Sequence, residues 1–408
     1  MIRRLGVPFV LSAVLLALAG RSSPITGSRG GAAPPGVSLE LPWAYVAVSP
    51  ISRTLDALTL LSGPQSIAVF ISATLILVLW MLLRSGPRRV RTSMRWLRAL
   101  GVLVIITGIL EAAAAFAPRP MARLRVSDPE AVRVDFHSHT GASHDVRRSF
   151  TAEDNREWHR AGGFDVAFVS DHVRFTGAAA GRAHNPARAG DGTSLLPAVE
   201  GRYHRIMSTI MLGLDERDTA LLNKRGNLMP GEPSAGRGPT TIVALPNRNL
   251  DSVTLQSLDS LPHFVALELV DAAPRGLGQL DREEARLLRI ASSLRLTLVA
   301  GSNNHGYGRT VAAWNVMTIP GWRGMNPDSV GRLIEAPLRA RKPDAVTIVM
   351  RSRPRTHGAA LAATLPVLGW KIVGSLTWRE RFVWLVWIWG ATLVSGVLRR
   401  RDPAESYR

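Results

Sequence analysis

Two apolar runs, residues 67–83 and 99–117, constrain the fold of this 408-residue chain more than any other feature. The first carries no charge before Arg84, and the second is interrupted only by Glu111. Runs of roughly 17–25 apolar residues are long enough to cross the hydrocarbon core of a bilayer as helices. An Arg-rich hairpin, residues 84–98, separates them, which disfavours the alternative of two helices buried in a soluble core. The sequence therefore predicts two transmembrane helices.

The N-terminal segment is also apolar. Residues 1–20 begin with Arg3 and Arg4 and end in small residues, so they form either a signal peptide or a first transmembrane helix. Residues 21–66 are expected to be an extracytoplasmic connector. Its Gly, Ser and Pro content predicts a loop over residues 22–50.

Two further apolar segments follow the central part of the chain. Residues 382–398 predict a last transmembrane helix, because they are apolar, rich in Trp and followed by three Arg. Residues 359–376 contain Pro366 and Lys371, so we expect an interfacial helix there instead of another span.

The distribution of Arg predicts the orientation of these helices, because basic flanks stay on the cytoplasmic side. We expect an integral protein of the plasma (inner) membrane, with both termini and the hairpin in the cytoplasm and the central domain outside. The residues on the predicted cytoplasmic face outnumber those on the opposite flanks: Arg3, Arg4, Arg84, Arg88, Arg89, Arg91, Arg95, Arg98 and Arg399 to Arg401, against Arg21, Arg119, Arg123, Arg125, Arg379 and Arg381.

The amino-acid composition narrows the classes of molecule that this protein is expected to bind. The net charge of +19 comes almost entirely from Arg, since Lys occurs only at positions 224, 342 and 371. Such a charge suits anionic lipid, phosphorylated substrates or nucleic acid. Nucleic acid is the least favoured of these, because no helix-turn-helix, RNA-binding signature or basic stripe interleaved with aromatics occurs. The absence of Cys excludes disulfides and thiolate metal sites.

The central region, residues 126–350, has a different pattern. Short β-branched and apolar runs alternate with helical patterns, of which residues 281–294 are the clearest. This alternation predicts an α/β domain with a parallel sheet or barrel, in which active groups lie at the carboxyl ends of the strands. The expected strands are residues 132–136, 164–169, 195–199, 240–245, 264–270 and 296–300.

Histidines and carboxylates follow four of these strands. His137 and His139 are two residues apart at a strand end, so their side chains point the same way and can converge on one metal ion. Imidazole suits Zn, Mn or Fe. Asp171 with His172 follows the next strand, and further strand ends carry Glu200 and the pair Asn303 and His305.

Together these segments resemble the polymerase and histidinol phosphatase (PHP) domain. The opening motifs are Asp-Phe-His-Ser-His-Thr at 135–140, Gly-Phe-Asp-Val-Ala-Phe-Val-Ser-Asp-His at 163–172 and Leu-Leu-Pro-Ala-Val-Glu at 195–200. Gly-Ser-Asn-Asn-His at 301–305 is similar to the closing motif of that family. The resemblance implies a distorted seven-stranded (β/α) barrel, flanked here by transmembrane helices.

The resemblance also implies a cluster of divalent metal ions (Zn, Mn or Fe). By position, the ligands would be His137, His139, His172, Glu200 and His305, with Asp145 or His144 as a further one and Asn303 at the place of a family Asp. Leu245 stands where the family has His, no His occurs near residues 209–212, and His204 is a possible substitute. One or two ions are therefore more credible than three.

The chemistry implied is hydrolysis of a phosphate ester, with Asp171 and Arg309 as candidate catalytic residues. Arg309 is the first candidate to clamp the phosphate, followed by Arg147 and Arg148. The expected substrate is a phosphorylated small molecule, lipid or envelope polymer. A degenerate, non-catalytic domain acting as a metal- or ligand-binding sensor or scaffold is the alternative, and hydrolysis of a C–N bond shares the same metal chemistry. The oligomeric state stays open.

Overall fold

The computed structural model describes residues 2–28, 31–85, 93–203, 207–222, 238–245 and 264–400. Part of the predicted hairpin (residues 86–92), the substitute ligand His204 and the final Arg401 lie outside the described residues.

The central domain is built on a ten-stranded mixed sheet, in the order β1-β12-β11-β4-β5-β6-β7-β8-β9-β10. Strands β4, β5 and β6 are parallel, as are β8, β9 and β10, whereas β7 and the β11-β12-β1 edge run antiparallel to their neighbours. The strands are β1 Ile25–Gly27, β4 Ala131–Ser138, β5 Val166–Val169, β6 Ser194–Tyr203, β7 Met207–Leu212, β8 Thr240–Val243, β9 Phe264–Asp271, β10 Thr297–Gly301, β11 Ala313–Thr318 and β12 Thr347–Arg351; a separate ribbon pairs β2 Val37–Glu40 with β3 Arg123–Val126.

The sheet curls until its last strand lies beside its middle. The buried side chain of Asn315 on β11 donates to the carbonyls of Val134 on β4 and Ala300 on β10, at 2.9 and 2.8 Å, and accepts from the Ala300 N–H at 2.7 Å. Beyond the strand ends, Ser138 and Asn304 form a parallel bridge. The curl therefore brings the carboxyl ends of β4, β5, β6, β9 and β10 around one centre.

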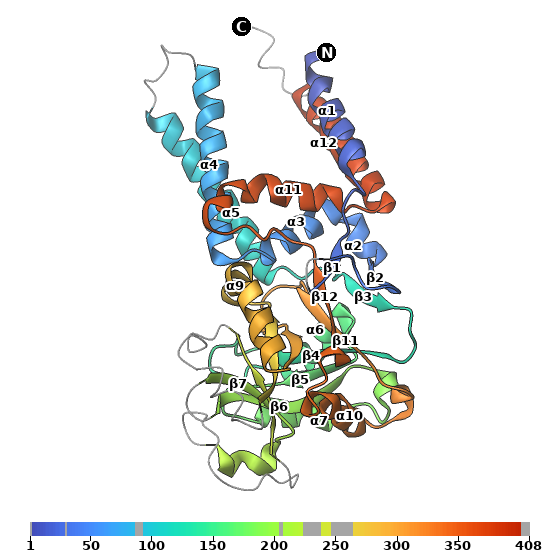
Figure 1. Ribbon diagram of the computed structural model, residues 1–408. Helices are drawn as coiled ribbons and strands as arrows, with labels where there is room; N and C mark the ends of the chain where they lie inside the picture. The colour runs from blue at the N-terminus through green and yellow to red at the C-terminus, as the bar shows by residue number, and fades with distance from the viewer. Residues whose placement is uncertain are drawn as a thin grey trace.

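Helices cover the outside of the sheet (Figure 1). The amphipathic helix α9, Pro274–Ser293, packs its apolar side on β9, and α6, α7 and α10 pack near the other strands. Their bounds are α6 Ala152–Gly162, α7 Thr176–Ala183 and α10 Pro327–Arg339, with short 3₁₀ turns η1 Ala189–Asp191, η2 Glu216–Leu221, η4 Trp322–Gly324 and η5 Pro343–Ala345.

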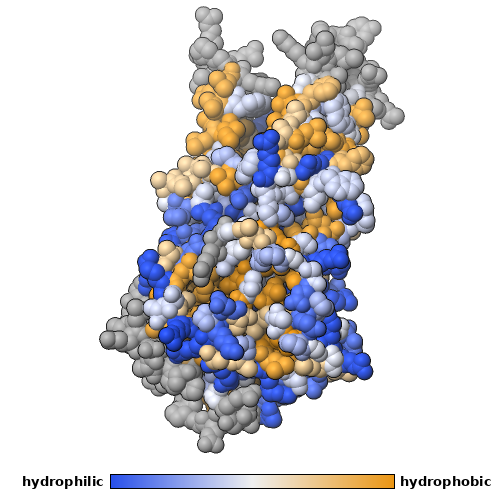
Figure 2. All heavy atoms as spheres, turned by 45° about the vertical axis from the view of Figure 1, so that its right-hand side comes forward, coloured by the Kyte–Doolittle hydropathy of each residue, from blue (hydrophilic) through white to orange (hydrophobic). Residues whose placement is uncertain are grey.

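Apolar helices project from one end of this domain as two pairs, α4 with α5 and α1 with α12 (Figure 1). Hydrophobic side chains gather along them (Figure 2). Between the pairs lie α11, α3 and α2, running across the projecting helices. The bounds are α1 Ile2–Leu18, α2 Trp43–Ala47, α3 Ser49–Thr59, α4 Gly63–Ser85, α5 Ser93–Phe116, η6 Gly358–Ala363, α11 Thr364–Gly374 and α12 Trp378–Arg400.

Two helices are long and apolar enough to cross a membrane, Gly63–Leu83 and Trp96–Phe116. Helices α11 and α12 meet that test only as a pair bent by 111°. The two predicted spans in the first third of the chain thus correspond to α4 and α5, while a span at residues 382–398 stays a prediction.

Buried ion pairs fasten the apolar helices to the domain. Arg53 on α3 donates to both carboxylate oxygens of Glu380 on α12, at 2.6 and 2.9 Å. Asp56, one turn further along α3, accepts from Tyr45, Thr310, Arg119 and Arg351 at 2.8 to 3.4 Å. These residues come from both ends of the chain and from the sheet, so the junction is one connected network.

The six expected strands and the helix at 281–294 are confirmed, but one expectation about the fold is wrong and another is met only in part. Residues 22–50 are not a plain loop: they hold β1, β2 and α2, because β1 pairs with β12 across more than three hundred residues of sequence. The expected distorted seven-stranded (β/α) barrel is met only in part, since the domain is mixed α/β with a curled ten-stranded sheet. β7 pairs antiparallel with both β6 and β8, which departs from the parallel alternation of a (β/α) barrel.

Candidate metal centre

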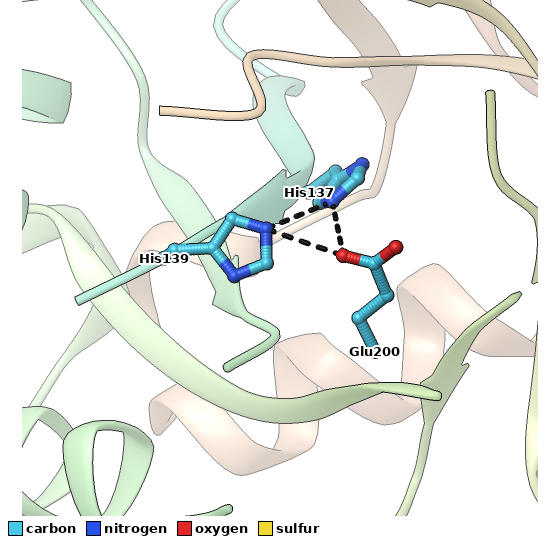
Figure 3. A group of neighbouring side chains, drawn as sticks. All are labelled: His137, His139 and Glu200. Atoms are coloured by element: carbon cyan, nitrogen blue, oxygen red, sulfur yellow. Dashed lines mark hydrogen bonds and ion pairs between the residues drawn. The ribbon is translucent and has the colours of Figure 1, made fainter. Parts of the chain in front are cut away.

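His137, His139 and Glu200 converge at the carboxyl end of the curled sheet (Figure 3). The Nε2 atoms of the two histidines are 3.0 Å apart, and Glu200 Oε2 lies 3.1 Å from the first and 3.4 Å from the second. All three side chains are buried. The alternation of a β-strand places His137 and His139 on one side, as predicted.

A second, more open group adjoins the first. His172 Nε2 lies 3.2 Å from Asp145 Oδ2 and 3.5 Å from Glu200 Oε2, so Glu200 lies between the two groups. His305 Nε2 is 3.3 Å from the same Asp145 oxygen. The exposed His144 also belongs here, since its ring centroid lies 5.0 Å from that of His172.

Hydrogen bonds behind the rings fix how two of the histidines point. Glu268 on β9 accepts from His137 Nδ1 at 2.9 Å, and the carbonyl of Asn303 accepts from His305 Nδ1 at 2.7 Å. A protonated Nδ1 leaves the Nε2 lone pair free for a cation. A carboxylate behind a ligand histidine, as Glu268 is placed here, is the usual partner in metal sites.

Burial and mutual charge set the protonation of the buried group. Burial, together with the charge of His137, lowers the pKa of His139 to about 4, so this ring is neutral at pH 7 and able to ligate. Burial alone would raise the pKa of Glu200, but His137 and the hydrogen bonds from both histidines hold it well below its usual range. Burial would also lower the pKa of His137, and the charges of Glu268 and Glu200 outweigh that effect.

The strand ends that carry the ligands are held by the hydrogen bonds of Asp135 and by close packing at Gly301. Asp135 accepts from His159 Nε2 at 2.7 Å on one oxygen and from the backbone N–H groups of His137 and Ser302 on the other. It thereby ties the end of β4 to the loop after β10. Gly301 has no room for a side chain, because a Cβ there would lie 2.1 Å from Glu268 Oε1 and 2.4 Å from His137 Cβ.

The donor set fits a divalent ion. The three ligand atoms of His137, His139 and Glu200 lie within 4.8 Å of one another, as do those of His144, Asp145 and His172. Bonds of about 2.0–2.2 Å from one ion to imidazole and carboxylate ligands leave neighbouring ligand atoms roughly 3–3.5 Å apart, which is the spacing within the buried group. Six of the seven predicted ligands, His137, His139, Asp145, His172, Glu200 and His305, are thus brought together.

The seventh predicted ligand, Asn303, has its side chain turned elsewhere. Its amide donates to both oxygens of Asp271 at 3.2 Å, and its backbone adopts φ +44°, a conformation that Asn tolerates better than most residues. Leu245, which stands where the PHP resemblance predicts a histidine, is buried, and its N–H donates to Glu268 Oε2 at 2.7 Å. A carboxylate from the neighbouring strand therefore occupies this part of the site.

Neither of the two predicted catalytic residues belongs to the two groups of ligand atoms. Both carboxylate oxygens of Asp171 accept hydrogen bonds from Thr140, from its N–H at 2.6 Å and its hydroxyl at 2.7 Å. Asp171 thus holds the turn that follows His139, which is a positioning role. Arg309 donates to the carbonyl of Arg119 at 3.3 Å, at the junction with the apolar helices.

Sequence reasoning missed Glu268 and Asp271, the two acidic residues of β9. Burial raises the pKa of both, and the charge of Glu268 raises that of Asp271 further. A signal was present: Phe264–Asp271 is an otherwise apolar run, and an acidic residue in the middle of a fully buried strand is rare unless it is paired.

No family profile matches the chain, and no curated protein matches it in sequence. Among solved structures it is similar to PsfC from Pseudomonas syringae PB-5123, at 12% identity and a TM-score of 0.37, over 59% of this chain and 96% of that chain. It is also similar to the lesion-specific endonuclease PfuEndoQ from Pyrococcus furiosus, at 15% identity and a TM-score of 0.34, over 50% of this chain and 56% of that chain. Likenesses this distant carry no weight for function, which rests on the side chains.

Proposed function

We propose that this chain is a membrane-anchored, metal-dependent phosphoesterase with a PHP-type domain. The observation that supports it is the convergence of His137 Nε2, His139 Nε2 and Glu200 Oε2, with Asp145, His172 and His305 alongside. When bound, a divalent ion such as Zn, Mn or Fe supplies Lewis-acid polarisation of a phosphoryl oxygen and activates water at neutral pH.

The residues of the chain prepare the site for this reaction. Glu268 holds the Nδ1–H of His137, and Asp135 and Asp171 hold the backbone on either side of the two ligand histidines. In the reaction, the oxygen of water forms a new P–O bond while the ester P–O bond breaks. One water proton ends on the leaving alkoxide oxygen and the other stays on the released phosphate.

The domain is proposed to lie outside the cytoplasm. The ends of α1 and α12 furthest from the domain point the same way as the far ends of the α4 and α5 pair (Figure 1). The Arg-rich segments of the sequence belong to those far ends, and basic flanks stay in the cytoplasm. These features support a metal centre on the opposite side of the plasma (inner) membrane.

One observation favours the alternative of a non-catalytic binding domain. Asn303 and Leu245 replace two family-type ligands, and the side chain of Asn303 is engaged with Asp271. A site with fewer ligands could keep one ion as a sensor or scaffold without turning over a substrate.

Metal reconstitution of the full chain separates these functions. The detergent-purified protein, stripped with a chelator, should regain hydrolysis of p-nitrophenyl phosphate and bis-p-nitrophenyl phosphate on addition of Mn, Zn or Fe. A chain that binds one ion tightly but hydrolyses neither ester would favour the binding domain. A chain that retains no ion would refute the phosphoesterase and the metal-binding form of the alternative.

A further inference from the structure

A pocket of about 270 Å³, partly open to solvent, lies between the apolar helices and the metal centre. One wall is made by Asn303 and His305, the second of which is a predicted metal ligand. The facing wall is mostly apolar, with Leu58 on α3, Leu61 just after that helix and Ala115 on α5, and it also contains Glu111 of α5. The pocket thus joins a metal-binding side chain to the base of the candidate spans.

The apolar wall lies at the membrane-facing edge of the domain. Helix α4 begins at Gly63 and α5 ends at Phe116, so the part of each helix that lines the pocket is its end nearest the domain. Tyr307, which lines the pocket, is 46% exposed and packs edge-on against Phe116, which is 60% exposed, with ring centroids 5.6 Å apart. Tyr side chains gather at the depth of the lipid headgroups, which fits the position of Tyr307.

The loop after His305 fixes this wall in position. Gly308 donates its N–H to the carbonyl of Ala115 at 2.7 Å, and Thr310 donates to Asp56 at 2.8 Å. The predicted ligand His305 therefore lies only three residues before Gly308, whose hydrogen bond reaches the last turn of α5.

We infer that the substrate is a phosphorylated membrane lipid, an inference that rests on the proposed phosphoesterase function. Its acyl chain would lie against Leu58, Leu61 and Ala115, and its phosphate ester would face His305. Hydrolysis consumes one water, breaks the ester P–O bond, and yields the lipid alcohol and inorganic phosphate.

The two walls of the pocket together favour a ligand that has both an apolar chain and a phosphate. A small polar ester would leave the apolar wall in contact with water, whereas an amphiphile covers it at a gain of roughly 25 cal/mol per Å² of apolar surface. A lipid without a phosphate would gain nothing from the histidines and carboxylates behind the other wall. A substrate that already resides in the bilayer also needs no path through water to reach a pocket at the base of the spans.

A charge placed on the apolar wall tests the inference. In detergent micelles, Ala115→Glu should lower kcat/KM for long-chain phosphatidic acid at least about tenfold, because it adds a second carboxylate, one turn after Glu111, to the surface that the acyl chain would cover. It should leave p-nitrophenyl phosphate hydrolysis within about twofold, since it changes no metal ligand. Ala112→Glu is the matched control: it lies on the same helix, is exposed and is not part of the pocket lining, and it should change neither rate.

A binding readout keeps the lipid test separate from catalysis. Phosphatidic acid carrying a diazirine on its acyl chain should crosslink to residues 58–61 and 111–116 of the metal-free protein, and Ala115→Glu should remove these adducts. Equal loss of both activities, no loss of either, or adducts unchanged by the substitution would overturn the lipid assignment. If neither ester is hydrolysed, the phosphoesterase proposal fails, and the crosslinks alone decide whether a lipid occupies the pocket.

Discussion

Two buried polar networks in this protein differ in what their atoms face. In the junction network, Asp56 accepts from Tyr45, Thr310, Arg119 and Arg351, and cations stand directly against carboxylates. In the metal centre, imidazole nitrogens and carboxylate oxygens face each other around a shared point. In the junction network, Arg side chains of the protein balance the charge of Asp56. In the metal centre, the proposed metal ion would supply the balancing positive charge.

This difference separates stability from function among the buried charges. Breaking an internally compensated pair leaves one charge buried and unpaired, so the folded state is weakened. Removing a ligand from the metal centre mainly removes affinity for the ion. Substitutions in the junction network should therefore lower the free energy of unfolding, whereas substitutions in the metal centre should lower metal affinity.

The largest effect is expected from the two ligands of β4. His137→Ala or His139→Ala should lower hydrolysis by about a thousandfold and reduce metal content, and the double variant should add little, because ligands of one site act as a unit. Metal content by mass spectrometry, with the exposed His184→Ala as a control, checks this. Full metal occupancy in the double variant would show that the ion binds elsewhere.

Breaking the junction should cost stability and spare the metal. Glu380→Gln should lower the free energy of unfolding by about 3–5 kcal/mol, because Arg53 is then left buried without its partner. Denaturant unfolding of the detergent-solubilised chain measures it. Arg53→Met combined with Glu380→Met should recover most of the loss, and metal content per folded protein should not change. A Glu380→Gln protein that loses its metal before it unfolds would erase the distinction between the networks.

A smaller effect is expected at Glu268, which acts through His137. Glu268→Gln keeps the shape and an acceptor oxygen but removes the charge behind the ring, and should weaken metal affinity by about 10- to 100-fold. Competition with a chelator of known affinity gives the ratio. Glu283→Gln on α9, whose side chain pairs with Arg286, is the matched control and should have no effect. An unchanged affinity would mean that Glu268 is merely a buried structural acid.

The smallest effect concerns Asn303. Asn303→Asp would place a second carboxylate against Asp271, and should lower the free energy of unfolding at pH 7 by about 1–3 kcal/mol, the usual cost of losing a buried hydrogen bond. Adding Asp271→Asn exchanges the donor and the acceptor between the two residues and should recover the lost stability. Tighter metal binding by the single variant would instead place residue 303 among the ligands.

The site was easier to predict than the fold around it. His137, His139, His172, Glu200 and His305 were identified from local motifs, since each follows a strand whose pattern is plain in the sequence. Asn303 was expected as a weakened ligand, but its side chain binds Asp271, which ends the neighbouring strand β9 and pairs with Gly301 of β10. Glu268 was not predicted because it meets His137 of β4 only through the curl of the sheet. Local patterns carry no information on which strand faces which.

There is also a physical reason why strand β1 was not predicted. Its three residues have no periodicity of their own, and only pairing with β12 makes them a strand. The two spans α4 and α5 were recognised from composition alone, because a bilayer demands long apolar helices whatever surrounds them.

The contacts between the two ends of the chain have a consequence for the order of folding. Ile25 pairs with Arg351, Arg53 binds Glu380, and Phe9 packs edge-on against Trp389, so the earliest residues find their partners among the latest. Contacts of such high sequence separation form slowly, because a long loop must close before they yield any stability. The first three apolar helices leave the ribosome well before these partners exist. The polar side chains of α3 must therefore stay hydrated or be chaperoned until synthesis reaches α12, and assembly is completed only then.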